Sequence, residues 1–113
     1  MRKDTRFVSK KICWKRVDDL IARNIRSLCT SLLPGGKINK RHEYIVKNPI
    51  RGDRHQGSFS VHVGSGPKCG MWYDFATHQG GDFISLWCYI RGSGLTRIEA
   101  ARQILSQLGE KTE

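Results

Sequence analysis

The spacing of apolar residues predicts a helix over the first third of the chain. Between Trp14 and Leu33 apolar residues recur at steps of three and four, as on one face of a helix, namely Val17, Leu20, Ile21, Ile25, Leu28 and Leu32. Asp18 and Asp19 stand near its start, where the helix dipole favours negative charge. We expect a single helix, ended by residues 34–36, Pro-Gly-Gly.

The last third of the chain predicts two further helices. Asp82 is a suitable N-cap for a helix that runs to about Ile90, because its carboxylate can accept from amides of the first turn. Thr96 and Glu99 have the spacing of a capping box for a last helix. The residues expected on the buried face of that last helix are Ile98, Ala101, Leu105 and Leu108.

Alternation of polar and apolar residues predicts strands between these helices. Residues 44–47 form a short strand after a charged turn at 37–43. Residues 58–63 alternate cleanly, and Phe59, Val61 and Val63 share one face. A glycine-rich hairpin loop over 64–70 leads to the next strand.

The strand over 71–75 has two unlike faces. Met71, Tyr73 and Phe75 make an apolar face, whereas Trp72 shares the opposite face with Asp74. We expect Phe75 in the core, together with Phe59 and Phe83. For Trp72 two environments stay open, which are exposure to solvent and packing against the N-terminal helix.

The order of elements predicts an α+β fold. We expect a small antiparallel sheet with one N-terminal helix and two C-terminal helices, as a single domain over residues 14–113 that follows a basic arm at 1–13. The 113 residues suffice for one modest core. No apolar run approaches the roughly 20 residues needed to span a bilayer, and the N-terminus does not resemble a signal peptide. We therefore expect a cytoplasmic protein without a membrane partner.

Charge is distributed very unevenly along the chain. The formal net charge is +10, and residues 1–54 hold 15 Lys and Arg against 5 Asp and Glu, whereas residues 55–113 hold 5 against 5. Such asymmetry indicates a polyanionic partner, most simply a nucleic acid. The alternative is a basic surface that only keeps the protein soluble.

Neither the cysteines nor the acidic residues indicate a metal or catalytic site. Cys13, Cys29, Cys69 and Cys88 show no Cys-x-x-Cys spacing, and we expect Cys29 and Cys88 to be small buried hydrophobes. The Asp18-Asp19 pair is adjacent on a helix, so its side chains diverge. We therefore expect no cofactor, no zinc and no enzymatic activity.

Five stretches together resemble the zinc-ribbon N-terminal domain of bacterial and phage DNA primases. In chain order they are 58–61 (Ser-Phe-Ser-Val), 74–77 (Asp-Phe-Ala-Thr), 80–84 (Gly-Gly-Asp-Phe-Ile), 94–96 (Gly-Leu-Thr) and 99–101 (Glu-Ala-Ala). The resemblance covers about residues 44–108. Its structural motif residues here are Ser58, Phe59, Asp74, Phe75, Gly81 and Asp82.

The resemblance also shows where this chain departs from the family. The positions at which the ribbon holds zinc carry Asn48, Arg51, Asp74 and Thr77, which are poor ligands or none. The chain is similar to a metal-less branch at the front of phage and plasmid primase–helicase proteins, which shares the turn at 33–36 and the run at 72–77. Side chains then have to replace the metal, and a charge-assisted bond between Arg51 and Asp74 is one candidate. The alternative is that both face solvent.

The resemblance implies a module that binds single-stranded DNA during replication or priming. A cationic groove and exposed aromatic rings are what such binding requires. The candidate contacts are Lys37, Lys40, Arg41, Lys47, Arg51, Arg54, Lys68 and Trp72. Two alternatives remain, which are a module that docks onto a replicative helicase or primase without touching DNA, and a regulator that mimics the primase domain.

Overall fold

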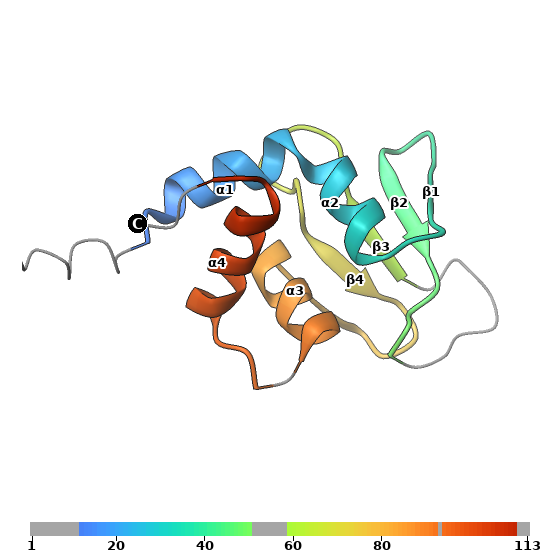
Figure 1. Ribbon diagram of the computed structural model, residues 1–113. Coiled ribbons are helices and arrows are strands. Elements are labelled where there is room, and N and C mark those ends of the chain that lie inside the picture. The colour runs from blue at the N-terminus through green and yellow to red at the C-terminus, as the bar shows by residue number, and fades with distance from the viewer. Residues whose placement is uncertain (1–11, 51–58, 93, 111–113) are drawn as a thin grey trace, which may run out of the picture.

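The computed structural model describes residues 12–50, 59–92 and 94–110, and it has the α+β architecture that the sequence predicts (Figure 1). Its elements are α1 (Trp14–Arg23), α2 (Ile25–Leu32), β1 (Lys37–Ile38), β2 (Glu43–Val46), β3 (Phe59–His62), β4 (Trp72–Asp74), β5 (Gln79–Gly81), α3 (Phe83–Arg91) and α4 (Arg97–Gln107). Within the described ranges no helix has the length and apolar character needed to cross a membrane.

The prediction of a single N-terminal helix is wrong, because the chain breaks at Asn24. The Asn24 amide Nδ2 donates to the carbonyl of Leu20 at 2.8 Å, and its backbone leaves the helical region at φ −120°. A short polar side chain that bonds nearby backbone groups competes with the helix in this way. The apolar stripe continues across the break, so both helices still bury one face.

The five strands form one antiparallel sheet in the order β1-β2-β3-β4-β5, each beside its neighbour in sequence. Strand β1 lies in the stretch predicted as a charged turn, and β5 was not predicted; they are only 2 and 3 residues long. Their sequences, Lys-Ile and Gln-Gly-Gly, carry no alternation, so nothing in the pattern distinguishes them from loops. The sheet is therefore a meander whose edges are both very short.

All four helices lie on one side of the sheet, and α2 and α3 are seen in front of it in Figure 1. The core fills the space between, and its largest fully buried side chains include Trp87, Phe59, Leu28, Leu33, Ile84, Leu86 and Ile104. Phe83 is buried as predicted, and the predicted capping box of Thr96 and Glu99 is present.

The buried face of α4 differs from the prediction at one end. Ala100, Ala101, Ile104 and Leu105 are buried, whereas Ile98 is 45% exposed. Because Ala100 and Ile104 are buried, the buried face of the helix is centred away from Ile98. Ile98 lies in the first turn, at the margin of that face. The expectation that Ile98 lines the core is therefore wrong.

Candidate nucleic-acid interface

Strand β4 faces the opposite way from the predicted orientation. Trp72 is 7% exposed and Asp74 fully buried, while Phe75 is 57% exposed. The reason is the pairing with β3, in which Val61 stands opposite Trp72 and Phe59 opposite Asp74. Cross-strand partners share a face of the sheet. The residues of β4 that pair with the buried Phe59 and Val61 therefore lie on the buried face as well. The predictions that Phe75 lies in the core and that Trp72 is exposed for stacking are both wrong.

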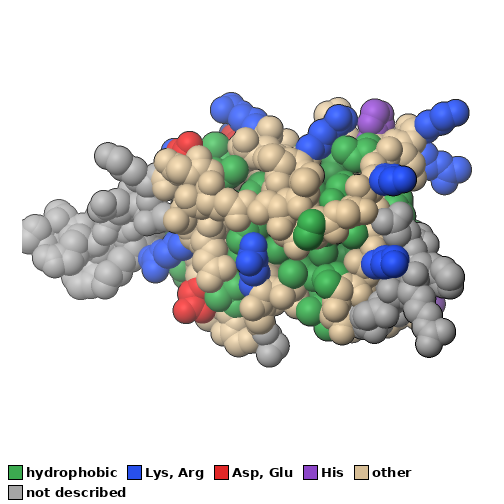
Figure 2. Space-filling model, turned by 45° about the vertical axis from the view of Figure 1, so that its right-hand side comes forward, with side chains coloured by type: hydrophobic (Ala, Val, Ile, Leu, Met, Phe, Trp, Pro, Cys, Tyr) green, Lys and Arg blue, Asp and Glu red, His purple; other side chains and the backbone are tan. Residues whose placement is uncertain are grey.

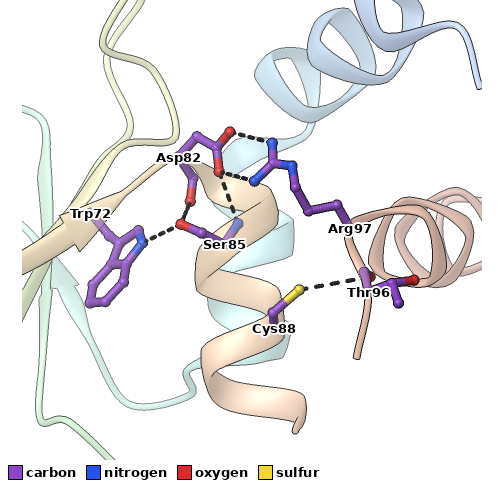
Figure 3. A network of polar contacts seen from close by, with 6 residues as sticks. All are labelled: Trp72, Asp82, Ser85, Cys88, Thr96 and Arg97. Carbon is purple, nitrogen blue, oxygen red and sulfur yellow. Dashed lines mark hydrogen bonds and ion pairs between the residues drawn. The ribbon is translucent and has the colours of Figure 1, made fainter. Parts of the chain in front are cut away.

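Trp72 is part of an aromatic cluster beneath α3. Its ring centroid lies 5.4 Å from Phe59 and 5.1 Å from Tyr89, and the Tyr89 ring is nearly parallel to it at 22°. Its indole Nε1 donates to the Ser85 hydroxyl at 3.0 Å (Figure 3). These ring contacts are with β3 and α3, so packing against the N-terminal helix does not describe its aromatic environment. Trp72 therefore belongs to the buried layer beneath the sheet face that carries Tyr73 and Phe75.

The open face of the sheet carries an aromatic pair, which consists of the exposed Phe75, predicted to lie in the core, and the half-buried Tyr73. Tyr73 and Phe75 meet edge to face, with ring centroids 4.8 Å apart and planes at 71°. The Tyr73 hydroxyl is 3.0 Å from Nδ1 of His78, which steadies the ring at the edge of the sheet. Met71, beside them, is 47% exposed. The signal that could have found this pair is the cross-strand partner of each residue on β3.

A shallow hollow of about 550 Å³ lies on this open face. Its lining combines the exposed apolar side chains of β4 with polar and basic ones, including Arg41, Glu43, His62, Lys68, Tyr73 and Phe75. Glu43 and His62 are directly paired across β2 and β3, and their side chains form a hydrogen bond. The acidic group in the hollow therefore already has a partner on the sheet.

The predicted basic residues surround this face unequally. Lys37, Lys40, Arg41, Lys47 and Lys68 are all exposed. Arg41 and Lys68 line the hollow, and Lys37 stands opposite Ile45 on the same face of the sheet. Figure 2 shows several Lys and Arg side chains projecting around the end of the molecule that carries β1 and β2. The acidic side chains visible in this view lie towards the other end. Arg51 and Arg54 lie outside the described residues, as does Ser58.

Two of the positions where the resemblance implies zinc ligands are joined by a hydrogen bond. Nδ2 of Asn48 donates to Asp74 Oδ2 at 2.9 Å and also lies 2.9 Å from the hydroxyl of Tyr89. Asp74 Oδ1 accepts from the amide of Ala76 at 2.9 Å. Both side chains are fully buried, so each of these bonds satisfies a group that would otherwise be costly to bury.

The remaining two ligand positions are Arg51 and Thr77. Thr77 is exposed, and the proposed bond from Arg51 to Asp74 lies outside the described residues. In the described part of the chain no three His, Cys, Asp or Glu side chains gather as a metal site would require.

Asp82 holds the start of α3 against α4. Its carboxylate accepts from the Ser85 amide at 2.9 Å and pairs with Arg97 at 2.7 Å (Figure 3). Burial alone would raise the pKa of Asp82, but the bonds from Arg97 and Ser85 outweigh it, so its pKa lies below the ordinary value. A side chain at Gly81 would meet the Ser85 Oγ at 2.4 Å, so the close approach of β5 to α3 requires glycine there.

Comparison with protein-family models, with curated proteins and with solved structures finds no match. A function therefore has to be inferred from the residues of the chain and their arrangement.

Proposed function

We propose that this chain is a non-catalytic module that binds single-stranded DNA across the open face of its sheet, as an accessory of DNA replication or priming. The observation that carries the proposal is the aromatic pair of the exposed Phe75 and the half-buried Tyr73, beside Arg41 and Lys68. Aromatic rings on a cationic surface are what bases and phosphates of a single strand require.

The apolar character of the open face supports binding of something flat and uncharged there. Met71 and Phe75 are about half exposed, and Tyr73 lies between them on the same face. Contiguous apolar side chains on a surface commonly mark an interaction site. Bases can stack on these rings whatever their sequence, because every base has a π-face.

The positions of the basic side chains indicate the direction in which a bound DNA strand would cross the sheet. Cross-strand pairing sets Tyr73, Ser60, Ile45 and Lys37 in one row from β4 to β1. With strands about 4.8 Å apart this row is about 14 Å long. A strand that stacks on Tyr73 and Phe75 would therefore lead its phosphates towards Lys37 and Arg41 at the other edge.

Two features support the link to priming. The ordered resemblance to primase ribbons covers about residues 44–108, and the structure brings Asn48 and Asp74, at two of the ligand positions, within 2.9 Å of one another. In this proposal a hydrogen bond joins the two hairpins where zinc does so in the resembled domain. The module then presents template to proteins that carry out the chemistry.

The test is fluorescence anisotropy with a labelled twelve-nucleotide deoxythymidine strand over a range of salt. We expect affinity to fall steeply as salt rises, because Lys and Arg side chains that contact phosphates displace the cations condensed on the DNA. Phe75→Ala and Tyr73→Ala should each weaken binding by about 1–3 kcal/mol. Ile98→Ala is the matched control, since it removes an apolar side chain of α4 that is 45% exposed, against 57% for Phe75.

Two results would overturn the proposal. One is undetectable binding of the strand at low salt. The other is equal loss of affinity in Ile98→Ala and Phe75→Ala, which would place the contact elsewhere. A duplex of the same length, used as competitor, distinguishes single-strand binding from general attraction to phosphates, because only exposed bases can stack.

A further inference from the structure

A second hollow, of about 710 Å³, lies on the helix side of β5 and is separate from the open face. Its lining comes from the β4–β5 turn, from one face of α3 and from β4, and includes Trp72, His78, Gln79, Ser85, Cys88 and Tyr89. Ile50, 54% exposed, adds an apolar side chain at its rim. Nothing in the proposed sheet-face contact uses this hollow.

The aromatic part of the lining is held firmly in place. Trp72 and Tyr89 are stacked with centroids 5.1 Å apart. The Trp72 indole is fixed by its bond to Ser85 (Figure 3), and the Tyr89 hydroxyl accepts from Asn48 at 2.9 Å. Trp72 is itself only 7% exposed and packs on Phe59 and Tyr89, so the half-buried Tyr89 is the ring available to a ligand. Because Tyr89 is already held in place, it loses little freedom when a planar ring binds to it.

The polar groups around the hollow suit a neutral ligand that can form hydrogen bonds. Gln79 is exposed on β5, where its amide can both donate and accept. The Tyr89 hydroxyl accepts from Asn48, which leaves its own proton available for an acceptor. Among the described residues that line the hollow there is no Lys, Arg, Asp or Glu. These groups fit a nucleobase, which is planar and uncharged and offers both donors and acceptors of hydrogen bonds.

His78 connects this hollow with the open face. It lines the hollow, and its Nδ1 lies 3.0 Å from the hydroxyl of Tyr73, which belongs to the aromatic pair of the open face. Only β5, three residues long, separates the two surfaces. A base next to one stacked on Tyr73 therefore has a short path around the edge of the sheet.

We propose that the hollow between β5 and α3 accepts one nucleobase. The base comes from the strand that lies on the open face, so this inference rests on the proposed function. A free nucleotide offers the same chemistry, and the experiment below separates the two sources. The competing occupant is an apolar side chain of a peptide. If the hollow binds such a side chain instead, no nucleic acid in the experiment will fill it.

Cys88 is one of the lining residues, and its thiol, which donates to the carbonyl of Thr96 at 3.8 Å (Figure 3), reports on access to this side of α3. Alkylation by N-ethylmaleimide is followed by peptide-resolved mass spectrometry, with exposed Cys13, outside the hollow, as internal control. Burial raises the pKa of the Cys88 thiol, so the reaction is run at about pH 8.5 to supply thiolate. We expect a saturating deoxythymidine strand to slow alkylation of Cys88 about tenfold and to leave Cys13 unchanged.

Three parallel measurements make the result decisive. An abasic strand of the same length should give no protection of Cys88, because it has no base to insert. Gln79→Ala should reduce the protection about threefold, whereas Thr77→Ala, an exposed change in the same turn, should not. If free deoxynucleoside monophosphates protect Cys88 but the strand does not bind in the anisotropy assay, the proposed base pocket is supported and the proposed function is contradicted. A strand that binds in that assay without protecting Cys88 would overturn the pocket alone.

Discussion

The two faces of β4 differ in what holds their side chains. On the covered face, Trp72 and Asp74 each have defined partners and are nearly or fully buried. On the open face, Phe75 is 57% exposed and has one aromatic neighbour, Tyr73. Alternation along one short strand thus separates residues that hold the fold from residues available for binding. We expect changes on the first face to alter stability and changes on the second to alter affinity.

The largest expected effect is on the covered face. Phe59→Ala removes a fully buried ring that contacts Trp72 and Tyr89, and should lower the free energy of unfolding by about 3–5 kcal/mol. Urea denaturation measures the loss. Phe75→Ala is the comparison on the open face and should change stability by less than about 0.5 kcal/mol. Equal losses in the two variants would abolish the distinction between the faces.

The next effect concerns the bond that joins the two hairpins. Asp74→Ala leaves the buried amide of Asn48 with the Tyr89 hydroxyl but without its carboxylate acceptor, and should cost about 1–3 kcal/mol of unfolding free energy. In a double-mutant cycle, Asn48→Ala should cost less in the Asp74→Ala background than in the wild type. Strictly additive losses would show that the two side chains do not stabilise one another.

A smaller effect is expected at Asp82, which belongs to neither face of β4. Its folded pKa is lowered, so its carboxylate contributes stability above its unfolded pKa, about 3.8, and this contribution is lost as pH falls through the lower folded pKa. Asp82→Ala should cost about 1 kcal/mol at pH 7. Asp82→Asn keeps a capping oxygen and should cost less. Melting temperatures from pH 7 to 3 should show a weaker acid dependence in Asp82→Asn than in the wild type.

The smallest effect has the opposite sign. Burial and the nearby Asp82 raise the pKa of Asp18, so folding favours its protonated form and the carboxylate disfavours folding at pH 7. Asp18→Asn should therefore stabilise the protein at pH 7 by about 0.5 kcal/mol or less, because the side chain is largely exposed. Asp19→Asn, its exposed neighbour, is the control. A loss of stability in Asp18→Asn would contradict this sign.

Local patterns predicted most of the elements correctly. Asp82 caps α3, Thr96 and Glu99 form the capping box of α4, and Phe59, Val61 and Val63 face the core. Each of these features depends on residues within a few positions of one another. Such short-range relations can be recognised in a sequence without knowing the rest of the fold.

The orientation of β4 could not be found from its own residues. Alternation shows which side chains share a face, but it does not show which face is buried. A carboxylate such as Asp74 argues against burial of its face of the strand, yet Asn48, 26 residues earlier, supplies a hydrogen bond that makes burial of Asp74 possible. The aromatic pair of the candidate site was missed for the same reason. Long-range polar partners decide such cases, and periodicity contains no information about them.

The ends of the described chain meet far from the sheet. Arg16, in α1, forms an ion pair with Glu110, just after α4, and both ends lie on the side of the molecule away from β1 and β2 (Figure 1). Adjacent termini are what permit a domain to be inserted into a loop of another protein or fused at either end. This fold can thus be joined to other polypeptides by its helical end while the open face of the sheet, where we propose that a strand binds, stays uncovered.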